Sequence, residues 1–191
     1  RRILVINPNT SEVMTESIRE SAERYALPDT ELTFVNVPIG PEAVDSLVDD
    51  ALAAAGVAVV MAQEAKAYNA FVIACGSDPG LDLARELTDA PVIGAGEAPM
   101  LLSLLLGHRF SILSTLSKDI PLDALQVRHL GLEQRYASTR PIGEGTLDAS
   151  GDLERTFKRL LAQGRLAIEE DGAEVLILTC AGMTGLDKRL Q

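Results

Sequence analysis

The sequence has few of the side chains that bind metal ions or form disulfide bridges. Its 191 residues include two cysteines and two histidines, Cys75, Cys180, His108 and His129. These are too few for a zinc site of cysteine and histidine or for a scaffold of disulfides, so we expect no metal. Sparse cysteine is typical of a reducing compartment, and we expect a cytoplasmic protein.

Positive charge and long apolar runs are also scarce. Lysine and arginine number 17 against 28 aspartate and glutamate residues, which gives a formal charge of −11 at pH 7. So acidic a surface repels nucleic-acid phosphates and anionic membranes. The longest apolar stretch, near 51–62, is shorter than the roughly 20 residues needed to cross a bilayer. We therefore expect neither nucleic acid nor a membrane as partner.

Apolar residues, by contrast, make up 47% of the chain, which is enough to build a folded core. Short apolar runs alternate with helical patterns, and this order predicts an α/β fold with parallel sheets. The predicted strands are Ile3–Ile6, Leu32–Val35, Phe71–Ala74, Val92–Ile93, Phe110–Leu113 and Val175–Leu178. The predicted helices are Ser11–Tyr25, Ala43–Lys66, Leu81–Leu87, Ala98–Leu106, Leu122–Leu130 and Leu153–Glu170.

One segment of the chain resembles another. Phe71–Gly76 and Val175–Gly182 are both apolar strands that end in a cysteine followed by small residues. In parallel α/β sheets, binding sites form at the carboxyl ends of the strands. The repetition predicts two similar lobes, residues 1–96 and 97–191, that face each other and bring both cysteines to one cleft.

The two cysteines are the strongest chemical signal, although a cysteine is often a small buried apolar residue. Gly76-Ser77 and Ala181-Gly182 follow them and favour turns in which a thiol reaches solvent and backbone N–H groups approach a ligand. Such N–H groups stabilise a thiolate, which can then act as a base. We predict Cys75 and Cys180 as catalytic residues and the four small residues as substrate-binding.

Polar residues follow two further predicted strands. Asn9 lies in the turn Asn7–Ser11, and Ser114-Thr115 follows Phe110–Leu113. An ordinary turn or helix cap explains either segment equally well. Because both would lie at the same sheet edges as the cysteines, we predict Asn9, Ser114 and Thr115 as substrate-binding residues.

Other polar features receive no role in the chemistry. Asp78 is expected to cap the following helix or to lie behind the substrate contacts. Gly94–Glu97 lacks the third glycine of a dinucleotide fingerprint. His108 and His129 have no partner pattern, and the acidic run 169–171 is typical of a solvated helix end.

Several motifs together resemble the hydantoin racemase branch of the aspartate/glutamate racemase superfamily, which includes allantoin racemases. They are Ile6–Ser11, Cys75, Ser77–Gly80, Ile93–Glu97 and Cys180–Met183. Amino-acid racemases of the superfamily tend to carry Cys-Asn-Thr and Cys-Thr-His where this sequence has Cys75-Gly76-Ser77 and Cys180-Ala181-Gly182. This difference favours a cyclic, weakly charged substrate, although the branch often has a bulkier residue at the position of Gly76.

The resemblance implies two pseudo-symmetric flavodoxin-like lobes with the active site in the cleft between them. A further strand and helix after Gln191 would complete the first lobe. It also implies a homo-oligomeric isomerase that acts without a cofactor on a small molecule. Its two cysteines would move a proton at C5 of a 5-substituted hydantoin such as allantoin.

Two alternatives remain open. An aspartate/glutamate-type amino-acid racemase or a maleate isomerase of the same superfamily would use the same two cysteines on a carboxylate. A non-catalytic small-molecule-binding module would keep the fold without the chemistry.

Overall fold

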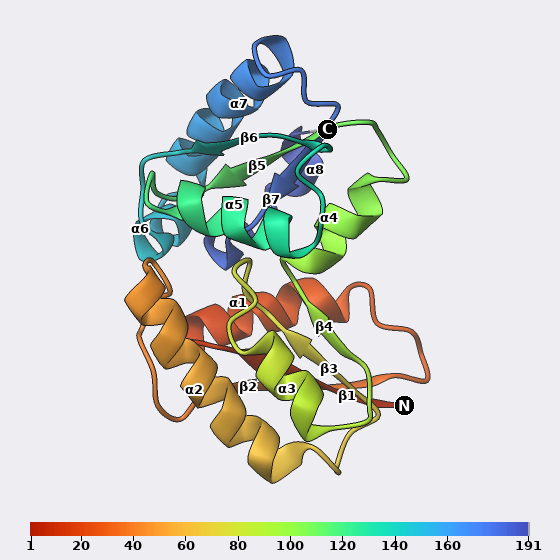
Figure 1. The fold of residues 1–191 in the computed structure, drawn as a ribbon. Coiled ribbons are helices and arrows are strands. Elements are labelled where there is room, and N and C mark those ends of the chain that lie inside the picture. The colour runs from red at the N-terminus through yellow and green to blue at the C-terminus, as the bar shows by residue number, and fades with distance from the viewer. Residues whose placement is uncertain (191) are drawn as a thin grey trace. The chain divides into compact units, whose positions relative to one another are not determined.

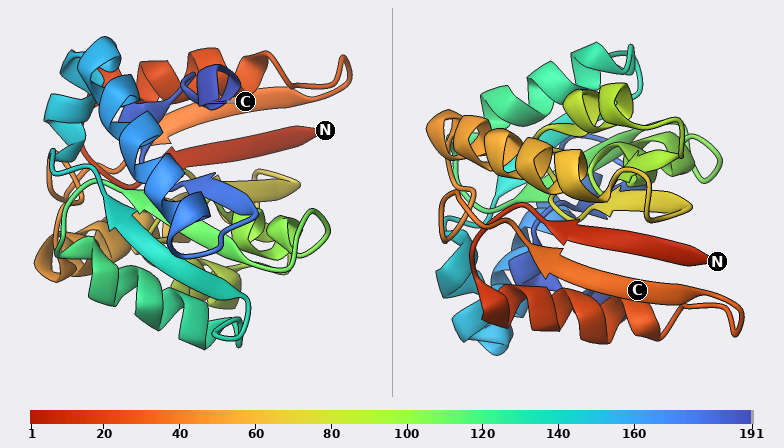
Figure 2. Two further views of the ribbon diagram at one scale, coloured as in Figure 1. Left: turned by 90° about the horizontal axis from the view of Figure 1, so that it is seen from above. Right: turned by 90° about the horizontal axis from the view of Figure 1, so that it is seen from below.

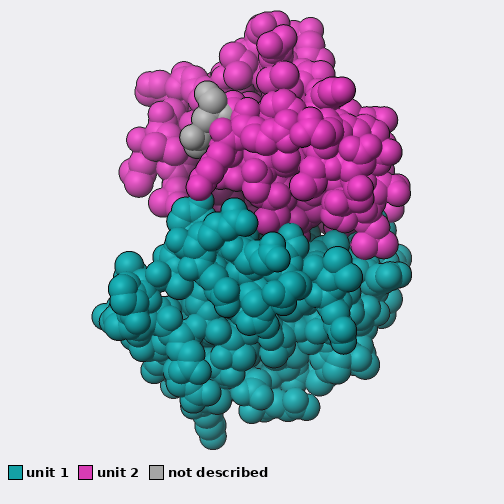
Figure 3. Space-filling view, turned by 180° about the vertical axis from the view of Figure 1, so that it is seen from behind, with its two compact units in different colours: residues 1–95 teal, residues 96–191 magenta. Residues whose placement is uncertain are grey.

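The computed structural model describes residues 1–190. The chain divides into two compact units, Arg1–Ala95 and Gly96–Gln191, which are coloured separately in Figure 3. Each unit consists of a parallel β-sheet with helices on both of its faces (Figure 1). The predicted α/β fold with parallel sheets is confirmed.

The first unit contains four parallel strands in the order β2-β1-β3-β4. The strands are β1 (Arg2–Asn7), β2 (Glu31–Asn36), β3 (Ala70–Ile73) and β4 (Val92–Gly94). The helices are α1 (Glu12–Glu23), α2 (Leu47–Glu64) and α3 (Leu81–Leu87). Helix α1 covers one face of the sheet, and α2 and α3 cover the other (Figure 2).

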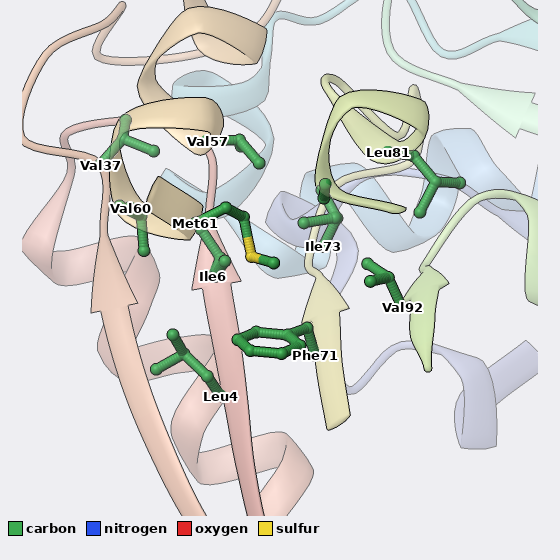
Figure 4. Packing of buried hydrophobic residues seen from close by; sticks show 11 residues of the cluster. Leu4, Ile6, Val37, Val57, Val60, Met61, Phe71, Ile73, Leu81 and Val92 are labelled. Carbon is green, nitrogen blue, oxygen red and sulfur yellow. The ribbon is translucent and has the colours of Figure 1, made fainter. Parts of the chain in front are cut away.

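The core of the first unit lies between its sheet and α2. Leu4 and Ile6 of β1, like Phe71 and Ile73 of β3, are fully buried. In Figure 4 these side chains lie beside apolar residues of α2, namely Val57, Val60 and Met61. Strands covered on both faces need apolar residues in succession, which explains why the apolar runs predicted these strands.

The second unit contains three parallel strands in the order β6-β5-β7. The strands are β5 (Phe110–Ser114), β6 (Tyr136–Pro141) and β7 (Val175–Leu178). The helices are α4 (Glu97–Ser103), α5 (Asp119–His129), α6 (Thr146–Gly151), α7 (Leu153–Glu169), the 3₁₀ helix η1 (Ala181–Met183) and α8 (Asp187–Leu190). Phe110 and Ile112 pack with Val127 of α5, whereas Leu113 packs with Leu160 of α7 on the other face.

The strands of the two units follow the same rule of order. In each unit the first strand lies between the second and the third. Each cysteine stands two residues beyond the end of the third strand, Cys75 after β3 and Cys180 after β7. The two thiols therefore occupy topologically equivalent positions.

The sequence-based prediction missed strand β6. Its side chains are mostly polar and find polar partners instead of an apolar layer. The Ser138 hydroxyl lies 2.8 Å from that of Ser111, and Arg140 forms an ion pair with Asp171 at 2.6 Å. Hydropathy patterns cannot reveal a strand held in this way. Helices α6, α8 and η1 were missed as well, since each is six residues or shorter.

Helix α2 begins at Leu47, four residues later than predicted. Ser46 is its N-cap and accepts a hydrogen bond from the backbone N–H of Asp49 at 3.1 Å. Within residues 1–190, no helix is long and apolar enough to span a membrane.

Truncation of a core leucine should cost far more stability than truncation of a surface one. Leu4 is 0% exposed and Leu105 is 82% exposed. We expect Leu4→Ala to lower the free energy of unfolding by about 2–5 kcal/mol. Leu105→Ala, the matched control, should change it by less than about 0.5 kcal/mol. Urea denaturation measures both, and equal losses would show that the core assignment is wrong.

Candidate active site

The carboxyl end of β1 is closed by a buried network of amide groups. The Nδ2 of Asn7 donates to Asn9 Oδ1 and to Thr15 Oγ1, both at 2.9 Å. Asn9 Oδ1 also accepts from the backbone N–H of Ser11 at 2.9 Å, and Asn9 Nδ2 donates to Met14 Sδ at 3.1 Å. The Asn9 side chain therefore shapes the strand-to-helix turn, whichever further contact it makes.

Cys75 begins the turn that follows β3 and is half-buried. Its Sγ lies 3.5 Å from the Ser77 hydroxyl oxygen. The backbone N–H of Asp78 donates to the carbonyl oxygen of Cys75 at 3.1 Å, and Asp78 has a positive φ of 51°. The turn thus brings the predicted residues Cys75, Gly76 and Ser77 together at one edge of the sheet.

Asp78 is a buried carboxyl, and of the two roles predicted for it the helix cap is wrong. The N-cap of α3 is Gly80, and no side chain caps that helix. The Asp78 carboxyl instead occupies the space beside Gly94, where an added Cβ would come within 2.3 Å of Asp78 Cγ. Gly94 therefore leaves room for Asp78 and takes no part in a dinucleotide motif.

Asp50, which the sequence did not single out, lies close to Ser77. Burial raises the pKa of the Asp50 carboxyl, and a hydrogen bond from the Ser77 side chain opposes that rise. Asp50 stands in the first turn of α2, where acidic residues are common for reasons of helix stability alone. Nothing in its sequence position distinguishes it from Asp49.

Cys180 precedes η1 and has a different set of neighbours. Its Sγ accepts a hydrogen bond from the backbone N–H of Gly182 at 3.3 Å. The same sulfur donates a hydrogen bond at 3.5 Å to the hydroxyl oxygen of Thr146, at the start of α6. A backbone N–H directed at sulfur stabilises negative charge there. The predicted residue Gly182 thus contacts the thiol, as does Thr146, which the sequence analysis missed.

Ser114 and Thr115 end strand β5 and are both buried. The Thr115 hydroxyl donates to Asp119 Oδ2 at 2.8 Å, and its carbonyl oxygen accepts from the backbone N–H of Gly143 at 2.9 Å. Ser114 Oγ has no hydrogen-bond partner among the residues that the structure describes. Thr115 therefore ties α5 and the loop after β6 to this strand, and Ser114 keeps an unused hydroxyl.

A buried glutamate that pairs with two exposed arginines supports the Cys180 side of the second unit. Glu144 is 7% exposed, and its Oε1 lies 2.6 Å from Arg155 Nε and 3.0 Å from Arg159 Nε. Its Oε2 accepts from the Thr156 hydroxyl at 3.2 Å. These contacts hold α7 against the loop that leads to Thr146.

In residues 1–190, no group of three or more histidine, cysteine, aspartate or glutamate side chains could hold a metal ion.

The chain is similar to several known racemases. A hydantoin racemase of Pseudomonas sp. (strain NS671) is 38% identical over 183 residues, which span 95% of this chain and 74% of that protein. The structure of an allantoin racemase from Klebsiella pneumoniae is 35% identical with a TM-score of 0.94, over 99% of this chain and 78% of that one. That of an allantoin racemase from Pseudomonas fluorescens is 35% identical with a TM-score of 0.95, over 100% and 81%.

Fold, thiol positions and relatives define an isomerase of the racemase type. The chain belongs to the Asp/Glu/Hydantoin racemase family, whose model matches residues 3–191.

Gly182 has little room for a side chain. An added Cβ would approach the carbonyl oxygen of Thr146 to 2.6 Å, whereas at Gly151, at the end of α6, it would meet nothing within 4 Å. We expect Gly182→Ala to push η1 away from α6 and to lower the free energy of unfolding by about 1–3 kcal/mol. Gly151→Ala, the control, should leave it unchanged or raise it slightly, and a similar loss in both variants would refute the steric argument. Thermal or urea unfolding gives the comparison.

A second buried carboxyl in this unit makes stability depend on pH. Asp123 of α5 accepts a hydrogen bond from the Thr139 hydroxyl at 3.1 Å. Burial raises the pKa of Asp123 to about 7, Thr139 opposes the rise, and the charge of Asp119 adds to it. Between about pH 4 and the folded-state value the unfolded chain releases this proton while the folded chain retains it, so stability falls as pH rises.

Replacing Asp123 by asparagine should remove this dependence. Below about pH 4 the carboxyl is protonated in both states and contributes no pH dependence. As pH rises toward 7, the unfolding free energy of Asp123→Asn minus that of the unaltered protein should increase by up to about 1.4 kcal/mol per pH unit. Denaturation at pH 4, 5.5 and 7 measures the difference. A difference that stays constant across these three pH values would contradict the prediction.

Proposed function

We propose that the chain is a cofactor-independent racemase in which Cys75 and Cys180 exchange a proton at C5 of a 5-substituted hydantoin such as allantoin. The observation that carries the proposal is the equivalent position of the two thiols, each two residues beyond the third strand of its unit. The hydantoin and allantoin racemases among the relatives support the choice of substrate.

The reaction requires one thiolate and one thiol. The thiolate removes the hydrogen from C5, so that the C–H bond breaks, an S–H bond forms, and the electron pair passes to the neighbouring carbonyl as an enolate. The other thiol then gives its proton to the opposite face of the carbon. Atoms and charge balance, and the two sulfurs have exchanged protonation states. Both thiols must reach the same carbon for this exchange, and that requirement is part of the proposal.

The enolate oxygen needs hydrogen-bond donors. The backbone N–H groups of Gly76, Ser77 and Ala181 are the proposed donors, and loss of a comparable donor raises a reaction barrier by about 3–4 kcal/mol. The N–H of Gly182 is directed at Cys180 Sγ, so we assign it to the thiolate rather than to the substrate. Asn9, Ser114 and Thr115 are proposed to contact the ring, and the unused hydroxyl of Ser114 favours such a contact.

Charge near Cys75 favours a neutral ring over an amino-acid or dicarboxylate substrate. Asp78 lies in its turn, and the Asp50 carboxyl is hydrogen-bonded to Ser77 of that turn. Arg155 and Arg159 in the second unit are engaged by Glu144. A substrate carboxylate would meet like charge beside Cys75. Aspartate, glutamate and maleate serve as comparison substrates, and turnover of these in place of hydantoins would support the amino-acid racemase or maleate isomerase alternative.

The association and location of the protein belong to the same proposal. We infer a homo-oligomer that acts in the cytoplasm on a small-molecule substrate. Sedimentation of the purified chain tests the oligomer, and a monomer at assay concentration would overturn this part alone.

Single cysteine variants test the two-thiol mechanism. Cys75→Ala and Cys180→Ala should each abolish racemisation of both enantiomers of a resolved hydantoin, measured by polarimetry, because inversion needs one sulfur to abstract and the other to donate. In deuterated water each variant can still exchange the proton of the enantiomer whose face its remaining thiol serves. The two variants should therefore exchange opposite enantiomers.

Serine variants are the matched controls, since a hydroxyl keeps the size of the group but is rarely ionised near neutral pH. They should be as inactive as the alanine variants while circular dichroism reports an unchanged fold. Full racemase activity in either alanine variant would contradict the two-thiol mechanism. Binding without racemisation or exchange by the unaltered protein would favour the non-catalytic module.

A further inference from the structure

A half-buried carboxyl, that of Asp50, neighbours Ser77 and has no part in the proposed reaction. Asp50 stands in the first turn of α2, and its Oδ1 is buried without a hydrogen-bond partner among residues 1–190. A buried carboxyl oxygen without a partner is costly, so the position of Asp50 calls for a physical explanation.

Close packing holds the turn 75–80 against α2. At Gly80 an added Cβ would lie 3.0 Å from the carbonyl oxygen of Ala54 and 3.2 Å from Val57 Cβ. Ala54 is one helical turn beyond Asp50, so the turn and the start of α2 are neighbours. This contact explains how Ser77 reaches the Asp50 carboxyl.

A single hydroxyl joins the two groups. Ser77 donates its hydrogen to the Asp50 carboxyl, and its oxygen lies 3.5 Å from Cys75 Sγ. A serine hydroxyl has only one hydrogen to donate. While that hydrogen is directed at Asp50, Ser77 can only accept from Cys75, and an accepted hydrogen bond from sulfur requires the protonated thiol.

We propose that Asp50 is a positioning residue that acts through Ser77 to hold Cys75 as the thiol, the proton-donating form. In this arrangement the Cys75 S–H donates a hydrogen bond to Ser77 Oγ, and the Ser77 O–H donates one to the Asp50 carboxylate. No bond is formed or broken in this arrangement, and Asp50 contacts no substrate. Its consequence for catalysis rests on the proposed function, whereas its effect on the thiol does not.

The charges around Asp50 favour this direction of the two hydrogen bonds, from Cys75 to Ser77 and from Ser77 to Asp50. Burial raises the pKa of Asp50, and the bond from Ser77 counters the rise and so favours the carboxylate. The other charged groups on the surrounding elements are Asp49 and Glu64 of α2, Asp78 of the turn, and Asp82, Arg85 and Glu86 of α3. Asp82 and Arg85 pair with each other at 3.8 Å. Removal of the Cys75 proton would add a negative charge to this mostly acidic region, which further favours the thiol.

Cys180 differs from Cys75 by one backbone contact. Each sulfur has a hydroxyl neighbour at 3.5 Å, Ser77 for Cys75 and Thr146 for Cys180, and Cys180 Sγ donates to Thr146. Cys180 Sγ also accepts from the backbone N–H of Gly182, which would stabilise a thiolate there, whereas the Ser77 hydroxyl is tied to Asp50.

The test follows the reactivity of Cys75 without any racemase assay. In the Cys180→Ala variant Cys75 is the only cysteine of the chain. Its alkylation by iodoacetamide, followed by mass spectrometry between pH 6 and 10, reports the thiolate because only the thiolate reacts. In Asp50→Asn the amide donates to Ser77 Oγ, and the Ser77 hydrogen becomes available to a thiolate.

We expect Asp50→Asn to lower the midpoint of the alkylation profile by about one pH unit and to raise the rate at pH 7 about threefold. Asp49→Asn removes the same charge from the same helical turn without contacting Ser77, and it should change the rate less. In a Ser77→Ala background the effect of Asp50→Asn should fall by more than half, because its route to the sulfur is gone.

An unchanged or slower rate in Asp50→Asn would overturn the inference. So would an equal rise in Asp49→Asn, or an effect that persists undiminished in the Ser77→Ala background. Because alkylation needs no turnover, the inference and the proposed racemase activity can fail separately.

Discussion

Parallel pairing of the strands is the constraint on which the rest of this structure depends. In a parallel sheet every strand leaves at the same edge, and each connection must return over a face as a helix. The chain therefore places Asn7, Cys75 and Gly94 at one edge of the first sheet, and Ser114 and Cys180 at one edge of the second. Helix starts gather at these edges too, which is why Asp50 lies beside Ser77 and Thr146 beside Cys180, residues far away in sequence.

The elements that the sequence predicted correctly are those whose own residues determine their structure. The apolar runs Phe71–Ile73 and Val175–Leu178 are typical of strands covered on both faces. The Cys-Gly and Cys-Ala pairs that follow them indicate turns. Strand β6 escaped prediction because its polar side chains are satisfied by Ser111 and Asp171, residues from other parts of the chain. No local pattern contains that information.

The candidate site likewise contains residues that the sequence could reveal and residues that it could not. Cys75 and Cys180 could be recognised from the strands before them, but their neighbours could not. Asp50 resembles any acidic residue at a helix start, and Thr146 any polar residue after a glycine. Each gains its significance from a contact made across the fold, with Ser77 in one unit and with Cys180 in the other. Asn9 could be placed in the turn, but its hydrogen-bond partners depend on how α1 packs.

Repetition of a topology does not make two chemical environments alike. The thiols hold equivalent positions, and each has a hydroxyl 3.5 Å from its sulfur. The hydroxyl beside Cys75 is tied to a carboxyl, whereas Cys180 also accepts a hydrogen bond from a backbone N–H.

Gly94 and Gly182 shape these two edges by what they lack. Because Gly94 has no side chain, the Asp78 carboxyl can occupy the space beside it. Because Gly182 has none, the turn after Cys180 can lie against the carbonyl oxygen of Thr146. Neither glycine has a side chain, so a substitution at either position acts first through the volume it adds. One extra carbon atom there would displace the Asp78 carboxyl or the turn after Cys180 without changing any other side chain of the sequence.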